Sequence, residues 1–247
     1  MGDGRVLEAV FVDFGGTLMP NALPMTAELE QWRARSLSGV LGPDPAKAAA
    51  VIEAIETAAL AAPVDRPDEV IVETLVRHGF RPDEVTVRRV RQALSVPLAG
   101  ALSPFPDAGD LLAGIKQLGL GCVIVSNTTF RDAATYGRDF EALGWAASID
   151  GCVTSVDAGC RKPDHRIFEL ALEAVGSRPG RCVMVGDSED ADISPAVGLG
   201  MRAILVSIER RPPRVTAADV CVTALEQALD VLKEWVRFDR RNLEAAP

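Results

Sequence analysis

Three polar residues, Asp13, Ser126 and Asp187, each follow a short apolar run that is typical of a buried strand, although they are spread over most of the chain. Lys162 lies between the second and the third of them and is likewise expected just past a strand-like run. Ligands of open parallel sheets bind beyond the carboxyl ends of the strands, so these side chains are expected to meet at one edge. A carboxylate, a hydroxyl, an amine and a second carboxylate at one site predict phosphoryl transfer.

The aspartates can take different parts in such a reaction. Asp13 can attack phosphorus and form an aspartyl phosphate, as carboxylate nucleophiles do. Asp13 and Asp187 can share one Mg²⁺ ion, which prefers a few carboxylates, waters and substrate oxygens as ligands. The backbone carbonyl of Gly15 can supply another ligand, and Asp192 can orient a metal-bound water. These four residues form the predicted magnesium site.

Lys162 and Ser126 complete the predicted site on the substrate side. The Lys162 ammonium would neutralise the nucleophile and the phosphoryl oxygens, and Ser126 would donate a hydrogen bond to a phosphoryl oxygen. Taken singly, each residue has a plainer interpretation, because an isolated aspartate after a strand is usually a turn residue and a serine there usually caps a helix. Their shared positions favour catalysis.

The elements that must position these residues alternate between strand and helix. This pattern predicts an α/β fold, a Rossmann-like, doubly wound parallel sheet with helices on both faces. Between residues 20 and 99 the pattern becomes helical, without β-branched strand runs. We therefore expect a catalytic core of residues 1–19 and 100–247 and an inserted all-α cap of residues 20–99. The cap helices are expected near residues 26–41, 45–62, 67–78 and 82–94.

Within the core, the expected strands and helices alternate after the cap. The strands are expected near residues 9–14, 121–126, 151–155, 181–185 and 203–206. The helices are expected near residues 108–118, 131–143, 163–175, 192–199 and 223–238. The predicted catalytic residues lie between these elements and not within them.

Composition and charge narrow the possible partners. The formal net charge of −9 disfavours nucleic acid and anionic membranes, and no apolar run approaches the ~20 residues of a membrane span. The N-terminal residues do not form a signal peptide pattern. The five cysteines contain no C-x-x-C pair, which predicts free thiols in a reducing cytoplasm. The sequence does not indicate an oligomeric state.

Four segments resemble, in order and spacing, the motifs of the haloacid-dehalogenase-like superfamily over essentially the whole chain. They are Asp13-Phe14-Gly15-Gly16-Thr17-Leu18, Val125-Ser126-Asn127, Arg161-Lys162-Pro163-Asp164 and Gly186-Asp187-Ser188-Glu189-Asp190-Ala191-Asp192-Ile193. Most members are Mg²⁺-dependent phosphatases of small phosphorylated metabolites, and the helical insertion is similar to their mobile cap. The resemblance implies a nucleophile, a metal ligand and a phosphate clamp, namely Asp13, Asp187, and Ser126 with Lys162. The predicted substrate contacts within these motifs are Gly16, Thr17 and Asn127.

One position departs from the phosphatase pattern. Family phosphatases usually carry a second aspartate two residues after the nucleophile, where this chain has Gly15. That residue is the general acid and base, and a positioned acid or base is worth about 10² to 10⁴ in rate. Three explanations compete: a good leaving group such as an acyl or anomeric phosphate, a proton supplied by the cap or the substrate, or a protein that binds without much turnover.

Two other branches of the family also lack this aspartate. Dehalogenating members work without metal, so the pair of Asp187 and Asp192 argues against them. Phosphonate-cleaving members need a Schiff-base lysine in the cap, and the only lysine of the insertion is Lys47. Because Lys47 looks like an ordinary exposed helical lysine, phosphonate hydrolysis is a minor alternative. Asn21, where the chain enters the insertion, is expected in a turn, although it could also contact substrate.

Overall fold

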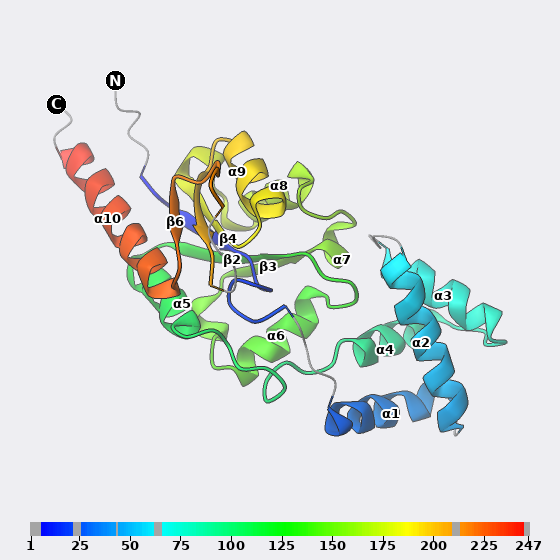
Figure 1. The fold of residues 1–247 in the computed structure, drawn as a ribbon. Coiled ribbons are helices and arrows are strands. Elements are labelled where there is room, and N and C mark those ends of the chain that lie inside the picture. Colours follow the sequence, from blue (N-terminus) through cyan, green and yellow to red (C-terminus); the bar gives the residue numbers. More distant parts are fainter. Residues whose placement is uncertain (1–5, 22–25, 43, 62–65, 209–212, 245–247) are drawn as a thin grey trace.

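The computed structural model describes residues 6–21, 26–42, 44–61, 66–208 and 213–244 of the chain. Figure 1 shows two bodies, a twisted sheet covered by helices and a separate group of helices beside it. The second body is formed by a segment that leaves the first after its first strand and returns before its second. This arrangement determines which residues can meet at the edge of the sheet.

The sheet has six strands, and every neighbouring pair is parallel. Their order across the sheet is β3 (Gly151–Thr154), β2 (Gly121–Ser126), β1 (Ala9–Val12), β4 (Cys182–Gly186), β5 (Arg202–Val206) and β6 (Val220–Val222). In the register of the central strands, Val12 lies opposite Ile124 on one side and Val185 on the other. The carboxyl ends of β2, β1 and β4 therefore lie side by side.

Helices cover both faces of the sheet. Both faces are therefore buried, which explains why the central strands are unbroken runs of apolar residues. Along β1, Val10 and Val12 point into one buried cluster, and Ala9 and Phe11 into the other. The first cluster is covered by α5 (Ala108–Gln117), α6 (Ala133–Ala142) and α10 (Leu225–Glu244), and the second by α8 (His165–Val175) and α9 (Ser194–Gly198). The doubly wound, Rossmann-like α/β fold expected from the sequence is confirmed.

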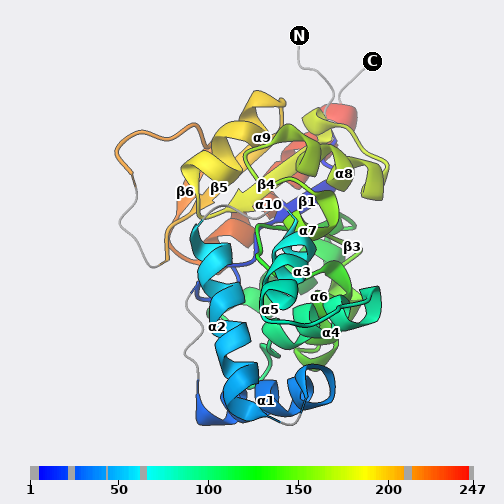
Figure 2. The ribbon, with the colours of Figure 1, turned by 90° about the vertical axis from the view of Figure 1, so that its right-hand side faces the viewer.

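The second body consists of four helices with a buried cluster of their own. They are α1 (Ala27–Leu41), α2 (Pro45–Ala61), α3 (Pro67–Arg77) and α4 (Glu84–Leu94), and Figure 2 shows them packed together. Buried residues recur at helical spacing, for example Val51 and Ile55 on α2, and Ile71 and Leu75 on α3. We call this group of helices the helical body; the cap limits at residues 20 and 99 remain a prediction.

The joint between the two bodies combines polar and apolar contacts. Arg91 of α4 donates to Asp132, the N-cap of α6, at 2.6 Å. The backbone amide of Leu98 donates to Asp139 of α6 at 2.9 Å. Phe130, in the loop after β2, packs against the buried cluster of the helical body. The loop that leaves one of the catalytic strands therefore also contacts the helical body.

Some elements differ from the expectation. The edge strand β6 and the short helix α7 (Ser155–Ala158) were not predicted. Lys162 does not end a strand but lies in the turn between α7 and α8. No disulfide joins the five cysteines, all of which are within the described residues. Among these residues, none of the helices combines the length and the apolar character that crossing a membrane would require.

Candidate active site

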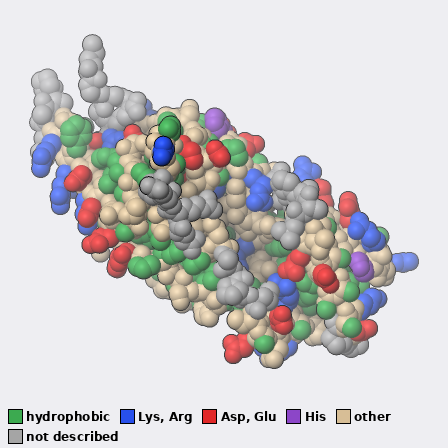
Figure 3. All heavy atoms as spheres, in the orientation of Figure 1, with side chains coloured by type: hydrophobic (Ala, Val, Ile, Leu, Met, Phe, Trp, Pro, Cys, Tyr) green, Lys and Arg blue, Asp and Glu red, His purple; other side chains and the backbone are tan. Residues whose placement is uncertain are grey.

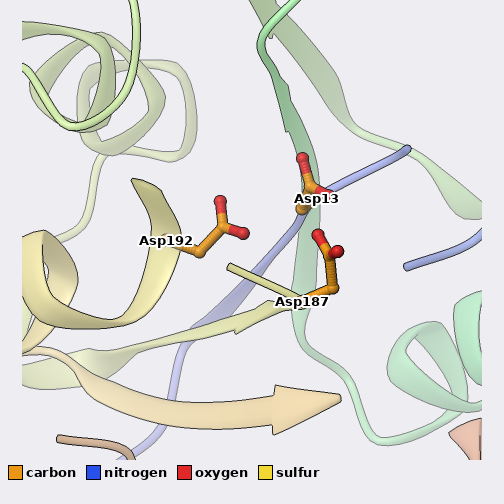
Figure 4. A group of neighbouring side chains, drawn as sticks. All are labelled: Asp13, Asp187 and Asp192. Carbon is orange, nitrogen blue, oxygen red and sulfur yellow. The ribbon is translucent and has the colours of Figure 1, made fainter. Parts of the chain in front are cut away.

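Three carboxylates converge beyond the carboxyl ends of β1 and β4. Asp13 directly follows β1 and Asp187 directly follows β4, its neighbour in the sheet. Asp192 belongs to the π-type turn η3 (Glu189–Ile193), which returns toward the same edge. One oxygen from each of the three lies within 4.8 Å of the others. Figure 4 shows Asp13 and Asp187 next to each other, with Asp192 reaching in from another segment.

The ammonium of Lys162 lies between two of these carboxylates. Its Nζ is 2.5 Å from Oδ1 of Asp13 and 2.6 Å from Oδ1 of Asp192. Nζ also donates to the backbone carbonyl of Val125 at 2.7 Å. The lysine side chain is only 2% exposed. A buried cation with three oxygen acceptors is held in one place, as a phosphate clamp requires.

The electrostatics of this pair follow from burial and close contact. Burial alone would lower the pKa of Lys162, but the charges of Asp13 and Asp192 and their hydrogen bonds outweigh it and raise the pKa. The ammonium is therefore charged at neutral pH. Burial raises the pKa of Asp192, and the negative charge of Asp13 adds to this effect while Lys162 opposes it. Lys162 is thus the cation that allows two buried acids to face each other.

Asn127 positions the turn that carries Lys162. Its side-chain amide donates to the Lys162 carbonyl at 2.9 Å, and its side-chain oxygen accepts from the Lys162 amide at 2.8 Å. Asn127 follows β2 directly, so these two bonds tie the lysine turn to the catalytic edge of the sheet. This tie explains how a residue eight positions beyond β3 comes to contact Asp13.

Two hydroxyl residues complete the surroundings of Asp13. Thr17 is buried and donates from Oγ1 to Oδ2 of Asp13 at 3.1 Å. Ser126, the last residue of β2, is also buried, and its Oγ lies 3.1 Å from Oη of Tyr136. The Tyr136 ring packs edge-on against Phe14, with ring centroids 4.7 Å apart. The tyrosine therefore supports both the serine and the residue after the nucleophile.

Asp192 reaches the site because a glycine leaves room for it. A Cβ atom on Gly186 would lie 2.6 Å from the Asp192 side chain. The Ser188 amide donates to Oδ2 of Asp192 at 3.0 Å and fixes the carboxylate. Asp192 is 1% exposed, whereas Asp190 is exposed on the outer side of the same turn. This geometry favours Asp192 over Asp190 as a member of the site.

Gly16 is required by both its conformation and its neighbours. Its φ of 81° is in the left-handed region, where residues with a side chain are strained. A Cβ atom there would lie 2.4 Å from Oδ2 of Asp187 and 2.6 Å from Nδ2 of Asn21. A cavity of about 250 Å³ begins at Gly16 and Asp187. The glycine therefore keeps the approach to Asp187 open.

The position of the missing acid is filled by another side chain. A Cβ atom on Gly15 would point directly at Oδ1 of Asn21, only 2.6 Å away. The Asn21 carboxamide thus extends over Gly15 and Gly16, where the side chain of an aspartate at position 15 would begin. Asn21 is also solvent-exposed. A carboxamide donates hydrogen bonds but does not transfer a proton as an acid does.

The donor set fits Mg²⁺. The ion prefers hard oxygen ligands from one or two carboxylates with water and phosphate, and Asp13 and Asp187 offer such oxygens beside the cavity. Asp192 is almost completely buried and does not line this cavity, whereas Asp187 does. Asp192 therefore suits a supporting position better than that of a principal ligand.

The structure brings together most of the residues singled out in the sequence. Asp13, Lys162 and Asp192 are in direct contact, and Asp187 lies within the same group. Sequence reasoning missed Tyr136, the only tyrosine of the chain. None of the four motifs contains Tyr136. Only its position in the first turn of the helix that follows Ser126 could have indicated that it lies near the site.

Comparison with known proteins identifies the family of the chain. A family model described as haloacid dehalogenase-like hydrolase matches residues 7–200. A glyceraldehyde 3-phosphate phosphatase from Methanothermobacter thermautotrophicus is 39% identical over 109 residues, which cover 44% of this chain and 46% of that protein. The chain spans about half the length of the curated relatives it matches.

Solved structures share the fold. A HAD phosphatase from Thermococcus onnurineus has a TM-score of 0.62 and 22% identity, covering 92% of this chain and 98% of that chain. A 2-haloacid dehalogenase from Pseudomonas syringae pv. Tomato also has a TM-score of 0.62, with 21% identity and coverage of 93% and 100%. The fold alone therefore does not separate phosphatase from dehalogenase chemistry, and the residues of the site must do so.

Proposed function

Because the chain belongs to the haloacid dehalogenase-like hydrolase family, we propose that it is a Mg²⁺-dependent phosphatase that acts on a small phosphorylated metabolite through Asp13. The observation that carries this proposal is the arrangement of the charges. Three carboxylates approach within 4.8 Å, and one buried ammonium bridges two of them. A carboxylate nucleophile facing a phosphate dianion needs positive charge beside it, and the excess of carboxylates over ammonium groups at this site would be offset by a bound Mg²⁺ ion.

The proposed reaction has two steps. A carboxylate oxygen of Asp13 attacks phosphorus, the bond from phosphorus to the ester oxygen breaks, and an aspartyl phosphate forms. Water then attacks phosphorus, the bond from phosphorus to the Asp13 oxygen breaks, and the Asp13 carboxylate is restored. The protons of the water end on the phosphate product and, through solvent, on the departed oxygen. Lys162 would place its positive charge beside the phosphoryl oxygens, and Ser126 would donate to one of them, through both steps. Mg²⁺, held by Asp13, Asp187 and the Gly15 carbonyl with support from Asp192, would supply positive charge at the transferred group.

We propose positioning roles for two residues predicted as substrate contacts. The Thr17 hydroxyl donates to Asp13, and the Asn127 carboxamide bonds to the backbone of Lys162. These contacts orient the nucleophile and the clamp. Gly16 remains a proposed substrate contact, because its missing side chain leaves the approach to Asp187 unobstructed.

The absence of an acid at Gly15 shapes the proposed substrate range. Without a proton donor, the departing oxygen must carry its negative charge, so the rate should depend steeply on the leaving group. Acyl and anomeric phosphates and aryl esters suit such a site better than alkyl esters do. The Asn21 carboxamide would lie near the departing oxygen, where it can donate a hydrogen bond without giving up a proton.

The helical body would act as the cap. We propose that residues 20–99 close over the catalytic edge of the sheet and exclude water during transfer. The net charge of −9 disfavours nucleic acid or an anionic membrane as partner. Figure 3 shows acidic and basic side chains interspersed over one face of the molecule. A reducing cytoplasm stays the expected location.

Phosphate release tests the proposal. The full chain would be assayed with Mg²⁺ against acyl, anomeric, aryl and alkyl phosphates. We expect turnover that declines in the order of leaving-group quality and that is lost in Asp13→Asn and after chelation by EDTA. Turnover that survives either treatment would refute the proposed mechanism.

One alternative has a specific observation in its favour. Asn21 occupies the space of the acid, as expected for a protein that keeps the phosphate pocket but binds its ligand with little turnover. Metal-dependent phosphate binding without hydrolysis of any ester would favour this alternative. Phosphonate hydrolysis is less supported, because the Lys47 ammonium lies over the Phe80 ring within the helical body, 4.5 Å from its centroid.

A further inference from the structure

A second and larger cavity lies at the joint between the two bodies. Its volume is about 680 Å³, and its walls come from α1 and α4 of the helical body, from α6, and from the linker after α4. Figure 1 shows these three helices facing one another at the joint. No residue of the four sequence motifs lines this cavity, which runs along α6 as far as Ala142. It is therefore separate from the site around Asp13.

Three arginines from three different helices line this cavity. They are Arg35 of α1, Arg89 of α4 and Arg138 of α6, and all three are exposed. None of them forms a salt bridge with a described residue. Their neighbours behave differently: Arg33 pairs with Glu56 at 2.9 Å, and Arg91 pairs with Asp68 and Asp132.

No described carboxylate is ion-paired with these arginines. Asp139 is the only acidic residue among the described lining residues, and its salt bridge is to the buried Arg131. Arg138 acts on Asp139, and Arg89 on Asp83, only as more distant charges. Arg138 donates to Oγ1 of Thr135 at 3.3 Å. The chain as a whole carries 35 acidic and 26 basic residues, so unpaired arginines are not a consequence of a shortage of carboxylates. Three arginines that line one cavity without a salt bridge of their own favour an anion bound between them.

The chemistry of the walls indicates the kind of anion. A guanidinium group presents a planar set of donors that matches phosphate and carboxylate oxygens. Three such groups from separate helices suit a ligand with more than one anionic group. The volume exceeds that needed for a single phosphate ion, and Trp32 and Gln92 add an aromatic wall and a neutral amide.

We propose that this cavity binds a small molecule that carries at least two phosphate or carboxylate groups. Because Arg35 and Arg89 belong to the helical body and Arg138 to the α/β body, the ligand would bridge the two. It would thereby stabilise the present position of the helical body relative to the sheet. This site does not depend on the proposed phosphatase reaction.

Calorimetric titration can test the site. The full chain with Asp13→Asn would be titrated in EDTA with inorganic pyrophosphate and, in a second arm, with citrate, so that neither metal nor hydrolysis contributes. We expect binding in at least one arm, and the arm that binds more tightly identifies phosphate or carboxylate as the preferred group. Replacing Arg35, Arg89 and Arg138 together by Gln should weaken binding at least ~100-fold, because three charge-assisted contacts are lost.

A matched control lies next to one of these arginines. Arg88 is exposed on the same helix as Arg89 but does not line the cavity, so Arg88→Gln should leave the affinity within about twofold. Ligand binding should also change the tryptophan fluorescence, and Trp32→Phe should remove that change. Absence of binding in both arms would overturn the proposal. So would a triple variant with the same affinity as the parent protein, because binding would then belong to another site.

Discussion

At the scale of the residue, Lys162 determines whether the charges of the site are balanced. It is the cation between Asp13 and Asp192, and all three side chains are at least nine-tenths buried. Removing one partner of a buried ion pair leaves the other charge without compensation. We therefore expect Lys162→Met to lower the free energy of unfolding by about 3–5 kcal/mol in urea denaturation.

Lys116 provides the comparison for this prediction. It pairs with Asp150 at 2.7 Å, but both side chains are more than one-third exposed. A solvent-screened pair of this kind contributes about 0–1 kcal/mol, so Lys116→Met should have a small effect. Equal losses in the two variants would show that Lys162 does not balance a buried pair of acids.

Asn21 leads to a second prediction at this scale. In Gly15→Asp, the new side chain would meet Oδ1 of Asn21, which must move away. Gly15→Asp combined with Asn21→Ala removes this obstacle. The double variant should therefore hydrolyse alkyl phosphates faster than either single variant, with a gain of up to about 10²–10⁴ over the natural chain if the new carboxyl acts as acid and base.

The measurement for this prediction is kcat on a series of esters with different leaving groups. A working acid makes kcat less dependent on the leaving group, whereas a merely structural change would alter all esters alike. Asn21→Ala alone is the control. An unchanged dependence in the double variant would mean that position 15 does not face the departing oxygen.

Much of the site was predictable at this scale because the sheet does the positioning. Asp13 and Asp187 follow apolar runs that form adjacent strands, so their convergence follows from the strand order. Lys162 was less predictable, since its position depends on the two hydrogen bonds from Asn127. The overlap of Asn21 with the place of the acid depends on a turn whose path no sequence pattern reveals.

At the scale of the element, α6 links the catalytic edge of the sheet to the helical body. Its N-cap Asp132 accepts from the Thr135 amide at 2.8 Å and pairs with Arg91 of α4 at 2.6 Å. Although burial acts to raise the pKa of Asp132, the bonds from Thr135 and Arg91 prevail and lower it below the ordinary 3.8. The charged carboxylate therefore stabilises the fold above pH 3.8, and this contribution is lost as the pH falls through the lowered value.

Asp132→Asn tests this contribution without removing the cap, since asparagine also caps helices. We expect a lower Tm than that of the natural chain at neutral pH and a difference that shrinks once the pH falls below 3.8. Asp83 caps α4 through Thr86 at 2.7 Å but forms no salt bridge with a described arginine, so Asp83→Asn should change Tm less. If the Tm difference between Asp132→Asn and the natural chain did not change with pH, the loss of a charge would not be its cause.

Element boundaries show which sequence signals are reliable. The long helices of the helical body begin and end within two residues of the expectation, because apolar spacing and start signals agree there. The strand β6 was missed because Val220–Val222 is too short for any periodicity to appear. The π-type turn η3 was also unexpected, since it depends on the side-chain contacts of Asp192 with Lys162 and Ser188.

At the scale of the whole molecule, the two bodies are joined by few contacts, and Phe130 is one of them. Phe130 lies in the loop after β2, and its side chain packs against the buried cluster of the helical body. We expect Phe130→Ala to loosen the joint and to speed amide hydrogen exchange in α4 while leaving β1 and β2 protected. Phe238 is 63% exposed on α10, so Phe238→Ala should change neither region. Uniformly faster exchange in Phe130→Ala would instead indicate global destabilisation.

The central claim is that Asp13 becomes phosphorylated during turnover. Its most direct test is to quench the full chain with acid during hydrolysis of an acyl or aryl phosphate in Mg²⁺ and to locate any phosphoryl adduct by peptide mass spectrometry. The account predicts one adduct on the peptide that contains Asp13, absent in Asp13→Asn and in EDTA. Turnover without an adduct on that peptide, accompanied by undiminished hydrolysis in Asp13→Asn, would contradict it.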